Sequence, residues 1–304
     1  MNFESKQRQT LSNFKKYECT LTSSYETYHG ISGHLFEIIE YFYYFTFFKK
    51  IKTNILISDG LPEEVFWNVI NEKYNFSNEE LEEYKLNTFF HFRPKAILAN
   101  NLFIVDGSLR VRNASILAKN IFMFRCNEDC TNYKNVIILQ DYDVYAPLEN
   151  SIDYKKKILL DKYKTIKETN NNIAMFYATS NSRALSGEEI KEIIKEFPEF
   201  DEYLILSNKY FDVPEKCRVE LVPIKNLWES FSTYIYTNAS SLIDCSPRFI
   251  VECKHFNKEV IFCTRGKKDR GLEVRMKDME KIDLNLKEDN DIFAKIEHAW
   301  YKAR

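Results

Sequence analysis

The sequence predicts an α/β protein whose mainly parallel sheets are divided between two halves. Short β-type runs, polar turns and helices follow one another, as where the run 53–58 precedes a helix from Pro62 to about Lys73. Two glycines, Gly30 and Gly33, separate an early β-type run from a long apolar segment. A clear strand at 172–179 starts a second series. We therefore expect the same architecture to occur twice.

The first half is expected to open with a flexible arm or surface segment at 1–16 and a first strand at Tyr17–Leu21. A helix over Gly33–Lys49 follows the glycines. A strand, a glycine turn and a helix start form the opening of a Rossmann-like half. The glycine spacing is not G-x-G-x-x-G, so no dinucleotide site is predicted. An acidic helix is expected at 78–84, and further strands at 95–98, 102–105, 116–124 and 135–139.

The second half follows a charged segment at 155–172, which we interpret as a helix with a linker. Ser186 is a helix N-cap, with Glu188 and Glu189 in the first turn. We expect strands at 202–206 and 219–223, and helices at 224–233 and 289–304. The predicted domains are 1–160, 161–290 and a C-terminal helix, 291–304.

Composition places the chain among globular proteins. Its 304 residues are 44% hydrophobic and 29% charged, and the net charge of −2 gives no overall basic field for nucleic acid. Seven scattered cysteines indicate reduced, mostly buried thiols. The polar start has no apolar signal core, and the run Leu35–Phe48, interrupted by Glu37 and Glu40, is too short to span a bilayer. We expect a cytoplasmic protein (host cytoplasm if viral) without stable membrane insertion; the oligomeric state is left open.

The stretch Tyr236–Cys263 combines a strand end, a polar loop, a helix and a returning strand. Ser246 is a fair N-cap, and Pro247 fits the first helical turn because its missing N–H costs nothing there. Free backbone N–H groups and the positive end of the helix dipole suit a phosphate. Arg248 adds a charged fork at the same place.

Two carboxylates bracket this helix start. Asp244 lies on the loop, and Glu252, eight residues later, lies about one and a half turns into the helix. A carboxylate there can accept both hydroxyls of a ribose and leave the phosphates to the helix start. Together with the turn and strand at 257–261, the pattern resembles the donor-binding signature of GT-B glycosyltransferases. Asp244 stands where that family has Glu, and the usual glycines of the loop and turn are absent.

The resemblance implies a GT-B-like fold, in which two Rossmann-like domains face each other across a cleft and the C-terminal helix, 291–304, crosses back to the first domain. It also implies a metal-independent glycosyltransferase whose donor is a nucleotide sugar, expected to be a UDP-sugar, with no other cofactor. Glu252 would bind the donor ribose, with Asp244 at the other acidic position. The remaining donor contacts would come from Gly33, Ser180, Arg183, Ser246, Pro247 and Arg248.

A second acidic pattern, Asp141-Tyr142-Asp143, follows a predicted strand. It invites comparison with the metal-binding D-x-D of GT-A glycosyltransferases. Because the spacing from Asp244 to Glu252 favours GT-B instead, no metal site is assigned.

The catalytic base is expected beside the glycine turn of the first half. His34, in the first helical turn, has the best position to take a proton from an acceptor hydroxyl. His29 and Glu26 are the other candidates, and Glu37 is a rival.

The acceptor is left open between a glycan and the hydroxymethylated bases of viral DNA. Basic runs at Arg93–Lys95, Arg110–Arg112 and Arg265–Arg275 favour DNA, whereas the net charge of −2 argues against it. A different class is also retained: a non-catalytic GT-B-like protein that binds a nucleotide or a glycan. A phosphorylase or an epimerase on the same scaffold is a further alternative.

Overall fold

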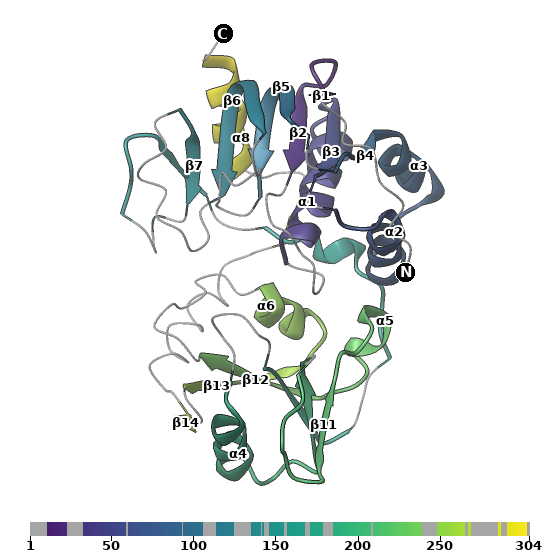
Figure 1. Ribbon diagram of the computed structural model, residues 1–304, viewed down its shortest axis with the longest axis vertical. Helices are drawn as coiled ribbons and strands as arrows, with labels where there is room; N and C mark the ends of the chain where they lie inside the picture. The colour runs from purple at the N-terminus through teal and green to yellow at the C-terminus, as the bar shows by residue number, and fades with distance from the viewer. Residues whose placement is uncertain are drawn as a thin grey trace. The chain divides into compact units, whose positions relative to one another are not determined.

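The chain divides into two compact units, Met1–Lys162 with Leu284–Arg304 (unit 1) and Tyr163–Asp283 (unit 2). They are described one at a time from a computed structural model (Figure 1). The structure describes residues 11–22, 33–58, 60–92, 94–105, 114–124, 135–140, 142, 146–154, 157–167, 171–178, 185–207, 209–238, 248–264, 267–268, 285–286 and 291–302.

Unit 1 is built on a parallel sheet with the order β4-β3-β2-β5-β6-β7-β8, with β1 pairing to β5. With β2 taken as the first strand, this is the doubly wound order that begins 3-2-1-4. The strands are β1 (Leu11–Asn13), β2 (Cys19–Thr22), β3 (Thr53–Ile57), β4 (Thr88–Phe90), β5 (Ala96–Ile104), β6 (Ser115–Phe124), β7 (Ile137–Gln140) and β8 (Ser151–Asp153). The two strands predicted at 95–98 and 102–105 are one continuous strand, β5.

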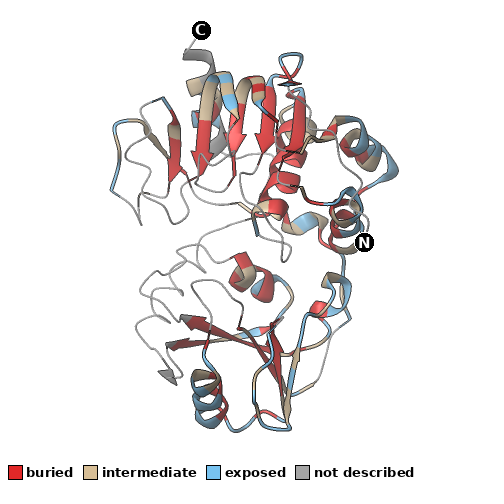
Figure 2. Cartoon of the chain, in the orientation of Figure 1, coloured by how far each residue is buried: buried red, intermediate tan, exposed pale blue. Residues whose placement is uncertain are grey.

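The helices of unit 1 include the expected apolar one. Figure 2 shows its residues buried like those of the neighbouring strands, and the ring centroids of Phe45 and Phe103 lie 5.4 Å apart. The α-helix ends at Tyr43, not Lys49; a π-helical turn continues it, and Lys50, with φ of 54°, follows. The helical segments of unit 1 are α1 (Gly33–Tyr43), η1 (Tyr44–Phe48), α2 (Glu63–Lys73), α3 (Asn78–Asn87), the 3-10 turn η2 (Leu160–Lys162) and α8 (Asp291–Lys302).

The expected flexible arm at 1–16 is wrong for residues 11–16. Leu11–Asn13 forms β1 alongside β5, and the Phe14 N–H donates to the Leu98 carbonyl at 2.7 Å. The Phe14 ring is 2% exposed and lies 5.2 Å from the Phe89 ring. Burial of this ring holds the segment on the sheet.

Unit 2 repeats the doubly wound plan. Its sheet has the order β11-β10-β9-β12-β13-β14, in which only the pairing of β13 with β14 is antiparallel among the described strands. With β9 as the first strand, the order begins 3-2-1-4-5. The elements are β9 (Ile173–Tyr177), α4 (Gly187–Glu196), β10 (Glu202–Leu206), β11 (Cys217–Glu220), α5 (Ile224–Leu227), β12 (Thr233–Asn238), α6 (Arg248–His255), β13 (Glu259–Thr264) and β14 (Lys267–Lys268).

Two apolar cores cover the two faces of the unit 2 sheet. On one face, Ile190 and Ile193 of α4 pack against the alternate residues Ala174 and Phe176 of β9. On the other face, α6 packs against residues that include Met175, the intervening position of β9. Figure 1 accordingly shows α4 and α6 on opposite sides of β12 and β13. Ser186 caps α4 as predicted, because its hydroxyl accepts from the Glu189 N–H and the Glu189 side chain accepts from the Ser186 N–H.

Two helix predictions in this half of the chain are wrong. The helix expected at 224–233 is one turn, α5, because the chain from Thr233 is taken into β12 between β9 and β13. The segment 155–172 is not a helix where it is described: it contains the short turn η2. Ile158 instead pairs in parallel with Asn285, and the Leu286 N–H donates to the Ile158 carbonyl at 2.6 Å.

Glu80 links η2 to the body of unit 1. Its carboxylate accepts from the Lys162 ammonium at 2.7 Å, from the Tyr43 hydroxyl and from the Ser77 N–H at 2.7 Å. Burial alone would raise the pKa of the Glu80 carboxyl, but the hydrogen bonds from Lys162, Tyr43 and Ser77 outweigh burial and lower this pKa.

Substituting Phe14→Ala should reduce the free energy of unfolding by about 3–5 kcal/mol, because it removes a buried ring from the core. Urea denaturation of the full chain measures this change. Lys15→Ala is the control, because Lys15 is exposed. This variant should leave the urea midpoint of unfolding almost unchanged. Equal midpoints for the two variants would mean that residues 11–16 do not pack on the sheet.

Substituting Glu80→Gln should cost about 2 kcal/mol of stability, because a hydrogen-bonded charge is lost. The pKa of the carboxyl is lowered from 4.5 in the folded state. The ionised carboxylate therefore contributes fully above that pH, and its contribution is lost as the pH falls through the folded-state pKa. Unfolding curves measured at pH 7 and pH 3 should therefore show that the free energies of unfolding of wild type and variant differ less at pH 3. Glu82→Gln, whose ion pair with Lys85 is exposed, should show little effect at either pH.

Candidate functional site

The site in unit 2 is defined by the strand order. β9 and β12 are parallel neighbours, and the chain leaves them toward helices on opposite faces, α4 and α6. Ligands of doubly wound proteins bind outside the carboxyl ends of strands at such a switch point. The loops that follow these two strands in the sequence carry Ser180, Arg183, Asp244, Ser246 and Pro247, all of which lie outside the described residues.

The order of strand, helix and strand predicted for Tyr236–Cys263 is confirmed, and the predicted loop at 239–247 lies outside the described residues. β12, α6 and β13 follow in that order, and β12 pairs with β13 in parallel. Ile250 and Cys253 give α6 its buried face, and Asn257, with φ of 54°, lies just beyond its end. Asparagine tolerates this left-handed conformation, so it is a suitable residue at a helix stop.

Arg248 and Glu252 lie one helical turn apart on α6, and both side chains are buried, at 7% and 2% exposure. Arg248 Nη1 lies 3.3 Å from Glu252 Oε1. The Tyr163 hydroxyl donates to the same carboxylate oxygen at 2.7 Å and accepts from Arg248 Nη1 at 2.8 Å. Three polar side chains therefore form a closed triangle beneath the start of α6.

The electrostatic effect of Glu252 extends to the end of β9. Burial raises the pKa of the Tyr177 hydroxyl, and the Glu252 carboxylate raises it further. Burial and Glu252 likewise hold the pKa of the Cys253 thiol well above its ordinary value. Both groups therefore stay protonated at neutral pH.

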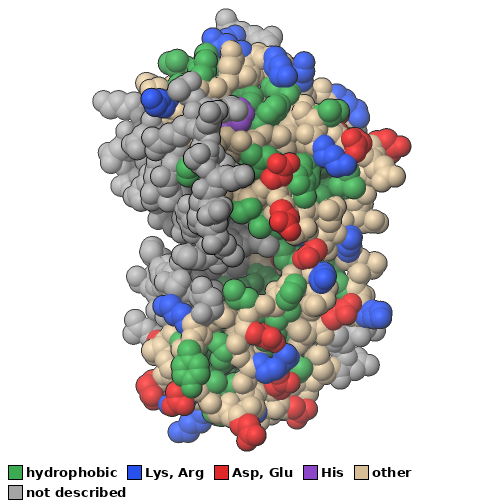
Figure 3. Space-filling view, turned by 45° about the vertical axis from the view of Figure 1, so that its right-hand side comes forward, with side chains coloured by type: hydrophobic (Ala, Val, Ile, Leu, Met, Phe, Trp, Pro, Cys, Tyr) green, Lys and Arg blue, Asp and Glu red, His purple; other side chains and the backbone are tan. Residues whose placement is uncertain are grey.

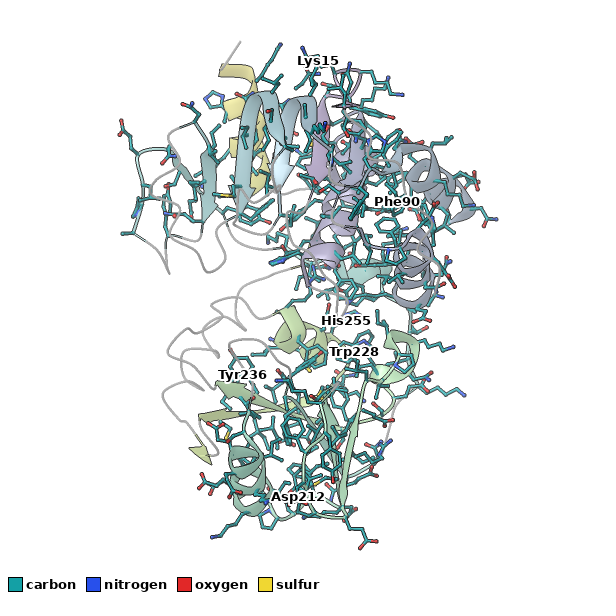
Figure 4. All side chains as sticks on the ribbon, in the orientation of Figure 1. Lys15, Phe90, Asp212, Trp228, Tyr236 and His255 are labelled. Atoms are coloured by element: carbon teal, nitrogen blue, oxygen red, sulfur yellow. The ribbon has the colours of Figure 1, made fainter. Side chains whose placement is uncertain are left out.

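Aromatic rings support α6 from the side of the sheet. The Trp228 ring lies 4.8 Å from the Phe249 ring and 4.6 Å from the Phe256 ring. Figure 4 labels Trp228 near His255, the last residue of this helix. Trp228 is a buried core residue, and it belongs to the packing under α6.

In unit 1 the corresponding switch point lies between β2 and β5. Gly33 and His34 begin α1 after the segment that follows β2, and His34 is partly buried. Glu37 is on the buried side of the same helix. Glu26 and His29 lie outside the described residues.

No group of three His, Cys, Asp or Glu residues that could hold a metal occurs in the described part of the chain. Asp141 and Asp143 of the D-x-D pattern lie outside it. The described cysteines Cys19, Cys217, Cys253 and Cys263 are free thiols. No described helix has both the length and the apolar character needed to cross a membrane.

Tyr163 is the residue that the sequence did not indicate. It lies in a charged segment predicted as helix and linker, and no motif marks it. Its partner Glu252 is 89 positions away, so only the folded chain reveals the contact.

The buried pair can be tested by its effect on stability. Glu252→Leu should cost about 3–5 kcal/mol, because it leaves the buried Arg248 charge uncompensated. The double variant Arg248→Met/Glu252→Leu should be more stable than that single variant. Chemical denaturation measures both. If the two side chains are not coupled, the losses of unfolding free energy caused by Glu252→Leu alone and by Arg248→Met alone should add up in the double variant. Additive losses would therefore contradict the buried pair.

Comparison with known proteins gives a likeness of fold at very low sequence identity. No family model matches the chain. No curated protein sequence matches it either.

The crystal structure of Anabaena Alr3699/HepE in complex with UDP-glucose is similar with a TM-score of 0.50 and 8% identity, over 88% of this chain and 92% of that one. The crystal structure of a glycosyltransferase from Rickettsia africae ESF-5 has a TM-score of 0.48 and 10% identity, over 95% and 93%. The α/β fold, with its two doubly wound parallel sheets, is GT-B-like, as the sequence predicts.

Proposed function

We propose that this protein is a glycosyltransferase that moves a sugar from a nucleotide-sugar donor, expected to be a UDP-sugar, to a hydroxyl group. The observation that carries the proposal is the placement of Glu252. This carboxylate is held on α6 directly beyond the loop at the unit 2 switch point, beside the end of β9. The likeness to HepE, which was crystallised with UDP-glucose, supports the same donor class.

Glu252 is the proposed ligand of the donor ribose. An ionised carboxylate is an acceptor only, and two neighbouring hydroxyls can both donate to it. Arg248 is engaged by Glu252 and Tyr163 through one nitrogen, and its positive charge adds to the potential at the start of α6. We propose that this potential, with Ser180, Arg183, Asp244, Ser246, Pro247 and Gly33 as further donor contacts, favours the departing diphosphate without a metal.

The base is proposed to be His34, with His29 and Glu26 as alternatives. A base must lie within hydrogen-bond reach of the acceptor hydroxyl. His34 lies in the first turn of α1, the helix that follows β2, and β2 is one of the two strands at the switch point where a doubly wound unit binds its ligands.

A glycan is the preferred acceptor over modified DNA. On the face of the molecule in Figure 3, Lys and Arg side chains are interspersed with Asp and Glu over the described residues. The net charge of the chain is −2. On this face the described residues form no continuous basic stripe of the kind that binds a phosphate backbone. The arginines of the runs Arg93–Lys95, Arg110–Arg112 and Arg265–Arg275 lie outside the described residues.

Donor binding can be tested by thermal unfolding with UDP, UDP-glucose and the diphosphates of the other nucleosides. A ligand at about a hundred times its dissociation constant stabilises the folded protein by about 2.7 kcal/mol. We expect UDP and UDP-glucose to raise the unfolding temperature of the wild type. Glu252→Gln should abolish the shift, while Glu192→Gln, at an exposed position of α4, should keep it.

The absence of a shift with any nucleotide in the wild type would overturn the proposal. If UDP-sugar binds, release of UDP should be measured with glycans and with DNA that contains hydroxymethylated bases. Binding without turnover on either acceptor would favour a non-catalytic binding protein.

A further inference from the structure

We propose that Tyr163 is a positioning residue that presents Glu252 to the ribose of the donor. This inference rests on the proposed function and assigns a part in it to a residue outside the recognised signature. The Tyr163 hydroxyl is 2.7 Å from Glu252 Oε1 and 2.8 Å from Arg248 Nη1, and the side chain is buried.

The direction of these hydrogen bonds follows from the chemistry of the three groups. A guanidinium can only donate, so Arg248 Nη1 donates to the Tyr163 oxygen. The single phenolic proton of Tyr163 is then directed to Glu252 Oε1. The hydroxyl therefore bridges the two side chains and supports this oxygen of the carboxyl group.

The Tyr163 ring is held independently of this network. It lies 6.1 Å from the Phe256 ring at an interplanar angle of 24°, and 5.7 Å from the His255 imidazole at 84°. Both rings belong to the end of α6 and the turn after it. A phenylalanine at position 163 can keep these ring contacts, so Tyr163→Phe removes the hydroxyl and leaves the packing in place.

The residue before Tyr163 also has a polar anchor, because the Lys162 ammonium binds Glu80 at 2.7 Å within unit 1. A carboxylate that binds two ribose hydroxyls has to be held in place by its neighbours, because a loosely held ligand group binds weakly.

The expected consequence is a loss of discrimination for the ribose hydroxyls. Tyr163→Phe should weaken UDP binding by about tenfold, the size expected for one lost hydrogen bond to a charged group. The affinity for 2′,3′-dideoxy-UDP, which lacks both hydroxyls, should change by less than about twofold. A purely structural loss would weaken both nucleotides equally.

The experiment is isothermal titration of the full chain with UDP and with 2′,3′-dideoxy-UDP. Wild type, Tyr163→Phe and Tyr203→Phe are compared after urea denaturation has confirmed that each is folded. Tyr203 is a buried tyrosine of unit 2 whose hydroxyl donates to the Phe197 carbonyl, with the Ile194 carbonyl at 3.3 Å, so its variant controls for the loss of a buried phenol.

A lower affinity of Tyr163→Phe for UDP alone supports the inference. Equal losses for both nucleotides, or no loss for either, overturn it and leave the donor site intact. If the wild type itself does not bind UDP, the proposed function fails and this inference fails with it. A wild type that binds both nucleotides equally would exclude the ribose as the partner of Glu252.

Discussion

Parallel strand pairing is the constraint on which the rest of this structure depends. A parallel neighbour can be reached only through a crossover, and the crossover helices must cover the faces of the sheet. In unit 2 the crossovers after β9 and β12 run to opposite faces, so the chain diverges at the carboxyl ends of two adjacent strands. The loops that carry most of the proposed donor contacts start from this edge.

The second constraint is the burial of charged side chains on α6. A carboxylate in the protein interior is tolerated only where partners replace its water. Arg248 and Tyr163 do this for Glu252, and the aromatic packing of Trp228, Phe249 and Phe256 keeps the helix on the sheet. The proposed ribose ligand is consequently preorganised, and the cost of ordering it is met when the protein folds.

Local patterns explain which elements the sequence predicted well. β9, the capped start of α4 and the β12–α6–β13 unit are each specified by residues within a few positions of one another. The errors fall where a distant partner decides. Residues 11–13 become a strand because β5 is available, and the helix expected at 224–233 stops after one turn because the chain enters β12 between β9 and β13.

The sequence by itself determined the α/β plan, the repetition of that plan and the spacing of Arg248 and Glu252 on one helix, because helical and strand periodicities act over short distances. Tertiary structure alone decided that Tyr163 meets Glu252, 89 positions away, and that Lys162 meets Glu80, 82 positions away. Contacts of that separation follow from the order of the strands and the path between the units. No local preference encodes them.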